Sequence, residues 1–268
     1  MFTDEKNFAS TVENFLFFNR TFSDDTLKTY RKVLLDLAKY VGNDLTVVKV
    51  ETIETFILRK RAKGRKASSC NLYINAIKSF YKWLSCRINT ADLGRLLNTL
   101  PALPPDQRIL SMAEYKKVCR KNPADDELAC FQFLCHTGLR VSELAGLGPD
   151  NLANGFLRIV GKGRRNRSIP LNSTAISIVR KYPDFSFVRR KKRLWMWRTC
   201  KKLAASAKIP TFSPHSCRHF FANELYHRGV DMYTISRLLG HADTKVTENV
   251  YVHWSEETLK GTTNILEN

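Results

Sequence analysis

Three prolines within ten residues divide this chain of 268 residues into two parts of different character. The stretch Asn98–Gln107 reads Asn-Thr-Leu-Pro-Ala-Leu-Pro-Pro-Asp-Gln, and its prolines cannot continue a helix. We therefore interpret residues 99–108 as a linker. It joins an N-terminal domain, residues 1–98, to a C-terminal domain, residues 109–268, and the chain is long enough to bury an ample core in each.

Apolar side chains in the N-terminal domain recur at the spacing of one helical face. They predict four helices, at about residues 3–19, 24–41, 50–62 and 67–86. Ser23 is a candidate N-cap for the second helix. We expect this domain to be a small helical bundle.

The C-terminal domain combines helices with a short β-hairpin. Phe156–Val160 and Ser168–Leu171 have the composition of strands, and residues 161–167 between them are rich in glycine and cations. The hairpin tip carries Lys162 between two glycines, and Pro170 restricts its strand to an edge of the sheet. Helices are expected at residues 125–137, 173–182, 193–208, 214–228, 232–239 and 244–251, with another beginning at Ser111. The chain is thus predicted to be mainly α with a small β-hairpin or sheet: an N-terminal helical bundle and a C-terminal α+β domain.

Positive charge is spread over the whole chain. It has 44 lysines and arginines against 25 acidic residues, a net charge of +19. Residues 1–100 hold 17 of these cations and 10 of the acids, so neither domain alone carries the excess. Such a distribution favours a polyanionic partner contacted along the whole protein, DNA or RNA. A basic protein without such a partner is the alternative.

Cysteine usage and hydropathy exclude several other classes. The seven cysteines form no C-x-x-C pair, and their odd number indicates reduced thiols in a cytosolic protein. The spacing of Cys130, Cys135 and His136 suits core packing better than zinc binding, and we expect no metal. No apolar run approaches the roughly 18 residues of a membrane span, and no secretion signal is recognisable. We expect a cytoplasmic protein with no membrane contact.

A cluster near the C-terminus has the residue types of a phosphate site. Pro214-His-Ser-Cys-Arg-His219 is followed by Leu239-Gly-His241 and by Tyr251. Residues three apart share a helical face, so His215 and Arg218 can address one ligand. Arginine clamps a phosphate with two hydrogen bonds, histidine handles protons, and tyrosine can be an oxygen nucleophile.

Further cations are candidate ligands for the same kind of partner. Gly138 is a predicted helix end, and Arg140 follows it with Glu143 one turn on, where the carboxylate can orient the guanidinium; a surface ion pair is the alternative. The basic runs at residues 59–66 and 189–193 are interpreted as phosphate-gripping segments rather than solvated loops. The basic turn of the hairpin can enter a DNA groove, and a solvated turn is an alternative of comparable weight. The candidate DNA contacts are Arg59, Lys60, Arg61, Lys63, Arg65 and Lys66 in the first domain and Arg164, Arg165, Arg189 and Arg190 in the second.

Together these motifs resemble the tyrosine recombinases, the lambda-integrase family, and the compact chain is most similar to the Xer-type enzymes. The resemblance rests on Thr-Gly-Leu-Arg-Val-Ser-Glu-Leu, the hairpin Gly-Lys-Gly to Ile-Pro-Leu, His-Ser-Cys-Arg-His, Leu-Gly-His and Tyr-Val-His. These strings occur in the family's order between Ile109 and Trp254. Residues 1–100 are similar only in type, as a helical DNA-clamping domain. Cys217 departs from the family, which more often has leucine there.

The resemblance implies a site-specific DNA recombinase that works without a cofactor, through a 3′-phosphotyrosine intermediate and a Holliday junction. It implies a tetramer on double-stranded DNA, in which residues 255–268 contact a neighbouring subunit, and it leaves open a partner recombinase or accessory protein. A type IB topoisomerase or telomere resolvase shares the chemistry, and a non-catalytic DNA-binding protein is a further alternative. The catalytic residues implied are Arg140, Lys162, His215, Arg218, His241 and the nucleophile Tyr251, with Glu143 in support.

Overall fold

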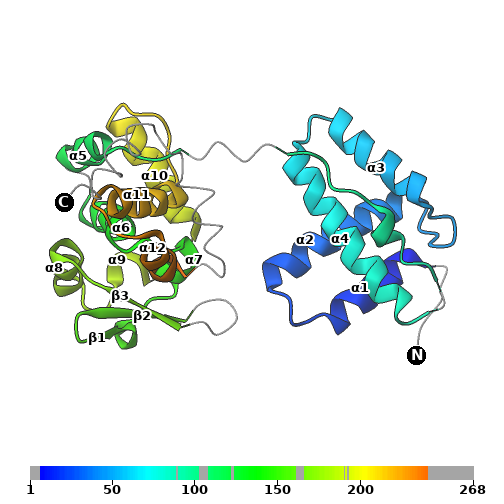
Figure 1. Cartoon of the computed structure of the whole chain (residues 1–268), viewed down its shortest axis with the longest axis horizontal. Helices are drawn as coiled ribbons and strands as arrows, with labels where there is room; N and C mark the ends of the chain where they lie inside the picture. The colour runs from blue at the N-terminus through cyan, green and yellow to red at the C-terminus, as the bar shows by residue number, and fades with distance from the viewer. Residues whose placement is uncertain are drawn as a thin grey trace, which may run out of the picture. The chain divides into compact units, whose positions relative to one another are not determined.

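The computed structural model describes residues 7–88, 90–102, 108–121, 124–160, 166–189, 191 and 193–240. The chain divides into two compact units, Met1–Pro105 and Asp106–Asn268 (Figure 1). Both are mainly helical, and the one sheet of the described residues belongs to the second, which confirms the predicted fold class. No helix among the residues described is both long and apolar enough to cross a membrane.

Unit 1 is the predicted helical bundle. The α4 helix contacts α1, α2 and α3, and the aromatic rings of Phe8, Phe15 and Phe80 pack together in the core. Ser23 caps α2, as predicted, by accepting a hydrogen bond from the backbone N–H of Thr26. The elements are α1 (Phe8–Phe18), α2 (Asp24–Tyr40), α3 (Val50–Ala62), α4 (Ala67–Ser85) and the 3-10 helix η1 (Leu93–Leu96).

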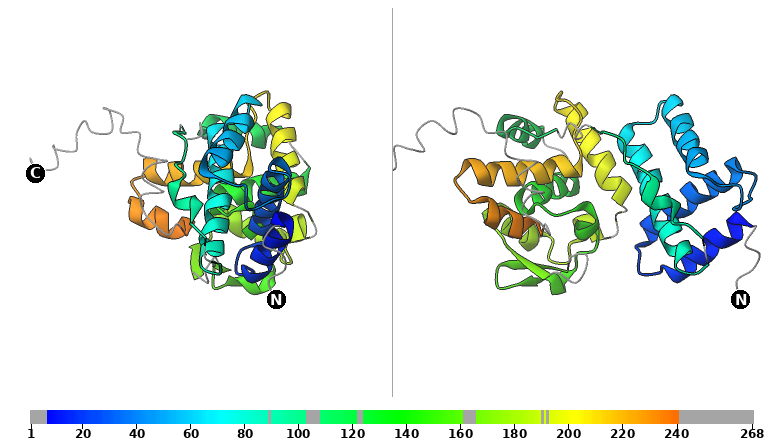
Figure 2. Two further views of the ribbon diagram at one scale, coloured as in Figure 1. Left: turned by 90° about the vertical axis from the view of Figure 1, so that its right-hand side faces the viewer. Right: turned by 45° about the vertical axis from the view of Figure 1, so that its right-hand side comes forward.

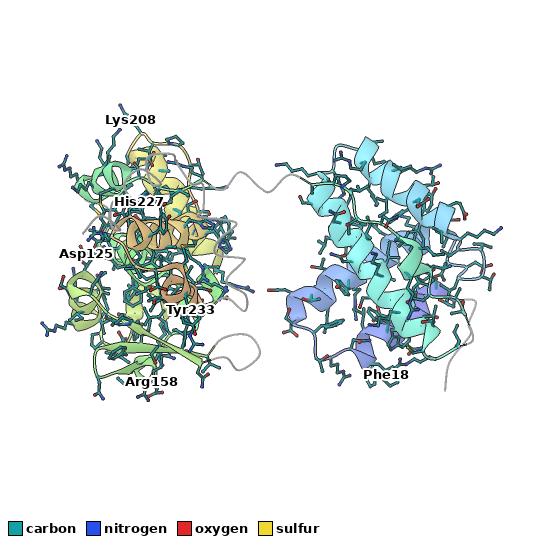
Figure 3. All side chains as sticks on the ribbon, in the orientation of Figure 1. Phe18, Asp125, Arg158, Lys208, His227 and Tyr233 are labelled. Carbon is teal, nitrogen blue, oxygen red and sulfur yellow. The ribbon has the colours of Figure 1, made fainter. Side chains whose placement is uncertain are left out.

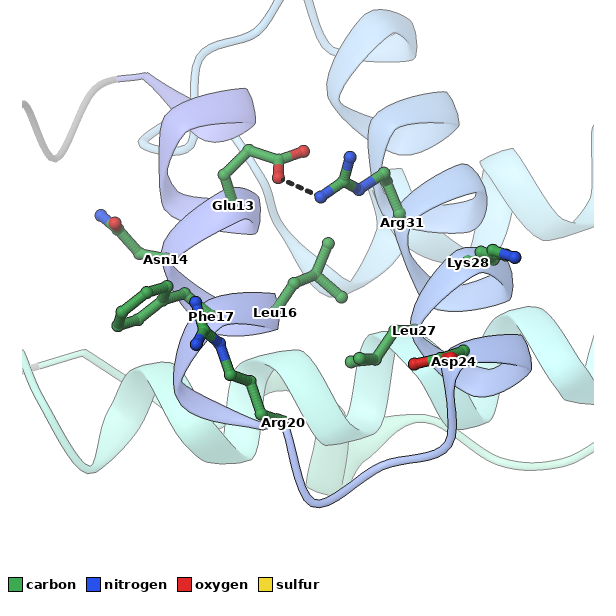
Figure 4. A pocket seen from close by; sticks show the side chains of 9 residues that line it. All are labelled: Glu13, Asn14, Leu16, Phe17, Arg20, Asp24, Leu27, Lys28 and Arg31. Carbon is green, nitrogen blue, oxygen red and sulfur yellow. Dashed lines mark hydrogen bonds and ion pairs between the residues drawn. The ribbon is translucent and has the colours of Figure 1, made fainter.

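A groove lies between α1 and α2 on the surface of unit 1 (Figure 4). Its volume is about 600 Å³, and Leu16 and Leu27 form its apolar floor. An ion pair of 2.6 Å between Arg31 Nη2 and Glu13 Oε2 joins the two helices beside it. Of the predicted catalytic residues that the structure describes, none lines this groove.

Unit 2 is built around α6, which contacts α8, α9, α10 and α11. The predicted capping box at Ser111 and Glu114 is present at the start of α5. The short helices α7 and α9 were not predicted, because four or five residues are too few to show helical periodicity. The helices are α5 (Met112–Arg120), α6 (Asp125–Thr137), α7 (Val141–Ala145), α8 (Ser173–Lys181), α9 (Ser186–Arg189), α10 (Arg193–Ser206), α11 (Pro214–His227), α12 (Met232–Leu239) and the 3-10 helix η2 (Pro149–Asn151).

The sheet has three antiparallel strands in the order β1–β2–β3: β1 (Leu152–Ala153), β2 (Phe156–Val160) and β3 (Asn166–Pro170). The predicted hairpin is confirmed, and Pro170 lies in an edge strand as expected. Leu157 and its cross-strand partner Ile169 are buried, whereas Arg158 is exposed on the outer face (Figure 3). The α12 helix lies between α11 and this sheet (Figures 1 and 2).

Candidate active site

Arg218 is the buried anchor of the site. It lies in the second turn of α11, which begins at Pro214 after the N-cap Ser213. Only 4% of Arg218 is exposed, and its guanidinium donates to two backbone carbonyls, Nη1 to Gly138 O and Nη2 to Leu239 O, each at 2.7 Å. These carbonyls lie at the C-terminal ends of α6 and α12, where helices leave acceptors unpaired. Arg218 therefore joins three helices at one point.

Gly138 allows the chain to turn from α6 towards Arg140. Its φ angle is +62°, in the left-handed region, and it ends α6 as predicted. A Cβ atom at this position would lie 2.4 Å from Cδ1 of Phe221. Only glycine fits both the conformation and the space.

Arg140 and Glu143 form the predicted pair. The Arg140 backbone N–H donates to Glu143 Oε2 at 2.7 Å, and Arg140 Nη1 donates to Glu143 Oε1 at 3.1 Å. The Arg140 side chain keeps 37% of its surface exposed, against 10% for Glu143. The carboxylate is thus buried behind a guanidinium that reaches solvent.

Arg167 is a member of this cluster that the sequence interpretation missed. Its Nη1 and Nη2 donate to the two oxygens of Glu143 at 2.9 and 2.8 Å, and its Nε donates to Leu238 O at 2.8 Å. Only 7% of the side chain is exposed. In the sequence Arg167 ends a run of cations and resembles a solvent-facing residue. Residues two apart in a strand share a face, and Ile169 in the same strand is buried. The signal available in the sequence was therefore that Arg167 shares the inner face of the strand with Ile169.

The two arginines keep Glu143 ionised. Burial alone raises the pKa of a carboxyl group, but the hydrogen bonds and charge of Arg167, with those of Arg140, lower the pKa of Glu143 from 4.5 to about 2. The cluster of Glu143 with two arginines therefore carries a net positive charge at every working pH.

Two histidines of α11, His215 and His219, have pKa values below the usual value of a histidine. His215 has an exposed side chain, and partial burial with the charges of Arg218 and Arg140 lowers its pKa. Burial, with His215 and Arg218 nearby, lowers the pKa of His219 to about 4. A neutral imidazole has one donor and one acceptor nitrogen, so His215 can serve a proton transfer in either direction.

The structure brings four predicted residues together in unit 2: Arg140, Glu143, His215 and Arg218. Lys162, Arg164, Arg165, Arg190, His241, Tyr251 and the predicted helix and tail beyond residue 240 lie outside the described residues. The described strand ends on either side of Lys162 are Val160 and Asn166, and Gly240 immediately precedes His241.

The predicted DNA contacts of unit 1 are of two kinds. Arg61, Lys63 and Lys66 are exposed around the C-terminal end of α3, and Arg59 and Arg65 are exposed too, with guanidinium groups over tyrosine rings. Lys60 is the exception, because its Nζ pairs with Asp36 Oδ2 at 2.9 Å and lies over the rings of Phe56 and Tyr73. In the second unit, Arg189 at the end of α9 is exposed.

Two family models and several known proteins match this chain. Residues 106–258 match the phage integrase family, and residues 12–87 match its N-terminal SAM-like domain. The tyrosine recombinase XerD of Oceanobacillus iheyensis is 31% identical over 283 residues, covering 92% of this chain and 93% of the relative. The XerD of Rhizobium meliloti is also 31% identical, covering 94% and 93% of the two chains.

Solved structures share the fold. The Tn1549 transposon integrase in complex with transposon right end DNA has a TM-score of 0.76 at 18% identity, covering 98% of this chain and 100% of the other. A lambda integrase dimer bound to a COC′ core site has a TM-score of 0.77 at 15% identity, covering 92% and 97%.

Proposed function

The chain belongs to the phage integrase family of tyrosine recombinases, which cleave and rejoin DNA in site-specific recombination, and on this premise we propose the roles of its residues. Tyr251 is the nucleophile, Arg140 and Arg218 stabilise the reacting phosphate, and Lys162 is the general acid. His215 and His241 hydrogen-bond the phosphate, and one of them accepts the proton of Tyr251.

The observation that carries this proposal is the shared environment of Arg140, His215 and Arg218. Burial lowers the pKa of His215, and the charges of Arg218 and Arg140 lower it further, so the two guanidinium groups lie close enough to the imidazole to interact with it. Arginine stays charged at any working pH, and two fixed guanidinium groups suit the negative charge that gathers on the non-bridging oxygens during attack. Because Arg218 is held by two backbone carbonyls, little reorganisation is needed when DNA arrives.

The proposed reaction replaces one phosphodiester bond by another at each step, so the energy of the broken bond is kept for rejoining the DNA. The phenol oxygen of Tyr251 attacks the scissile phosphorus, forming a P–O bond to tyrosine while the P–O bond to the 5′ oxygen breaks. Lys162 gives its proton to that leaving oxygen. The resulting 3′-phosphotyrosine is then attacked by the 5′-hydroxyl of a second duplex, which releases the tyrosine. Two such exchanges make and resolve a Holliday junction.

The assembly that we propose follows the likeness to integrases solved with DNA. Residues 1–98 clamp double-stranded DNA at a specific site, residues 99–108 link them to the catalytic domain, and four chains act together in the cytoplasm. The tail, residues 255–268, contacts a neighbouring subunit. The proposed phosphate contacts are Arg59, Arg61, Lys63, Arg65 and Lys66 with Arg164, Arg165, Arg189 and Arg190.

The test is covalent attachment to DNA. Duplexes that the protein binds are first selected from a random-sequence pool. They are then prepared with a nick, and on such a nicked substrate the cleaved strand stays covalently bound to the enzyme. The variant Tyr251→Phe keeps DNA binding and forms no adduct. Its control is Tyr233→Phe, which changes an exposed tyrosine of α12 (Figure 3) and forms the adduct normally. An adduct formed by Tyr251→Phe removes the nucleophile assignment.

A further inference from the structure

Arg167 is a buried cation that the proposed reaction leaves without a role. Its guanidinium makes three hydrogen bonds, two to the carboxylate of Glu143 and one to the carbonyl of Leu238. Burying a charge is unfavourable unless every donor finds an acceptor. A buried arginine held by three hydrogen bonds therefore needs an explanation beyond the packing of the sheet.

The contacts of Glu143 show which arginine orients it. Arg167 makes a two-pronged contact at 2.9 and 2.8 Å, whereas the Arg140 side chain makes a single contact at 3.1 Å. A two-pronged pair fixes the plane of the carboxylate as well as its distance. The carboxylate is thus oriented by Arg167 and presents its remaining acceptor capacity to Arg140.

Charge gives the second argument. A single Arg140–Glu143 pair would be neutral, and a neutral pair stabilises a developing phosphate charge poorly. With Arg167 on the same carboxylate, the three groups carry one net positive charge. The exposed member of the cluster is Arg140, so the uncompensated charge is available on the side that solvent, or a phosphate, can reach.

A third contact ties Arg167 to the end of α12. Its Nε bonds the carbonyl of Leu238, and Arg218 bonds the carbonyl of Leu239, the next residue. A Cβ atom at Gly240 would lie 3.0 Å from Cδ of Arg167, so the helix end packs directly on this side chain. Arg167 is consequently immobile relative to both Glu143 and α12.

We propose that Arg167 is a positioning residue for Arg140: through Glu143 it fixes the guanidinium of Arg140 and keeps the cluster positively charged. This inference rests on the proposed role of Arg140 at the reacting phosphate. A displacement of about 1 Å at such a group can lower the rate 10²-fold. Arg167 itself does not touch DNA.

The test uses two nicked substrates made from duplexes selected by the protein. One has an ordinary scissile phosphate, and the other has a methylphosphonate, in which a methyl group replaces a charged non-bridging oxygen. Arg167→Gln lowers the rate of adduct formation on the phosphate by about 10²-fold and leaves DNA affinity unchanged. On the neutral methylphosphonate the loss is much smaller, because less charge has to be stabilised. The matched control is Arg158→Gln, an exposed arginine on the neighbouring strand of the same sheet, which is normal on both substrates.

A purely structural role predicts a different result. Partial unfolding lowers the rate on both substrates by the same factor. The ratio of the rate on the phosphate to the rate on the methylphosphonate therefore separates a positioning role from a folding role. Arg167→Lys supplies the same comparison if the glutamine variant does not fold. Equal losses on the two substrates overturn the inference, as does an additive loss when Arg167→Gln is combined with Arg140→Ala. If Arg140→Ala alone cleaves normally, the role of Arg140 in the proposed function fails instead.

Discussion

The two units of this recombinase place their cations in opposite ways. In unit 1, Arg59 and Arg65 are exposed with their guanidinium groups over tyrosine rings, and the ion pair of Arg31 with Glu13 is exposed. In unit 2 the side chains of Arg167 and Arg218 are buried, and hydrogen bonds to protein acceptors hold their guanidinium groups in place.

This difference separates two tasks that a phosphate-binding protein must perform. Surface cations keep their hydration and exchange water for phosphate at little structural cost, which suits contacts along a DNA backbone. Buried cations cost more to build, but their positions are set before the substrate arrives, which suits the stabilisation of a transition state. Substitutions of the buried arginines in unit 2 are therefore expected to change rates, and substitutions of the surface cations in unit 1 to change affinity.

The largest expected effect is on the rate of cleavage by Arg218→Ala. The substitution removes a donor to the reacting phosphate and leaves the carbonyls of Gly138 and Leu239 without partners. We expect adduct formation at saturating DNA to fall by about 10³-fold. The contrasting variant, Arg59→Ala in unit 1, should weaken DNA binding with an unchanged rate at saturation. A rate defect of Arg59→Ala as large as that of Arg218→Ala would end the distinction between the units.

The second prediction concerns acid stability. The pKa of Glu143 falls from 4.5 to about 2 on folding, so its carboxylate stabilises the folded state above pH 4.5 and this stabilisation is lost as the pH falls towards 2. The difference corresponds to about 3 kcal/mol in the free energy of unfolding. Glu143→Gln should therefore have a flatter pH profile of unfolding free energy over that range, measured by denaturant titration. Identical slopes for the two proteins would show that the buried cluster is not linked to stability.

The third prediction compares two glycines with left-handed backbone conformations, one in each unit, that differ in how closely other atoms pack around them. Gly138 has a φ of +62° with Phe221 against it, whereas Gly64, after α3, has a φ of +82° with no atom within 4 Å of an added Cβ. Gly64→Ala should cost only the conformational strain, about 1–2 kcal/mol. Gly138→Ala should cost about 1–3 kcal/mol more because of the clash. Thermal unfolding of the two variants provides the measurement, and equal losses would contradict it.

The smallest expected effect is on the salt dependence of DNA binding. Each phosphate contact contributes about −0.9 to the slope of log K against log salt concentration, and at least about six contacts are expected over both units. Lys63→Ala should make the slope shallower by about 0.9, the contribution of one phosphate contact. Lys60→Ala, which removes the lysine paired with Asp36, should leave the slope unchanged. A wild-type slope shallower than about −3 would mean that most of the surface charge does not face DNA.

Local signals predicted much of this molecule. Helical periodicity and capping residues are properties of neighbouring positions, so α12 was expected at its observed bounds and α2, α3 and α4 within one residue of theirs. The pairing of Arg140 with Glu143 was likewise predictable, because the two lie three residues apart, about one helical turn, in the sequence.

The rest of the site depends on partners that are distant in sequence. Arg167 and Glu143 are 24 residues apart in the sequence, and Arg218 and Gly138 are 80 apart. No local sequence pattern could therefore predict either contact. The contact of Glu143 with Arg140 is present as expected, but this carboxylate makes its two-pronged contact with Arg167. The two-residue strand β1 was missed because it is too short for any periodicity.

The two carbonyl contacts of Arg218 also bear on when during its synthesis the chain can damage DNA. They join residues that are 80 and 21 positions apart, and Arg167 reaches 71 positions to Leu238. Such contacts close long loops and form only when the tertiary structure of the whole unit has formed. A nascent or partly unfolded chain therefore lacks the contacts that hold Arg218 in place. If Arg218 has the proposed catalytic role, the same long-range contacts make DNA cleavage conditional on complete folding of unit 2.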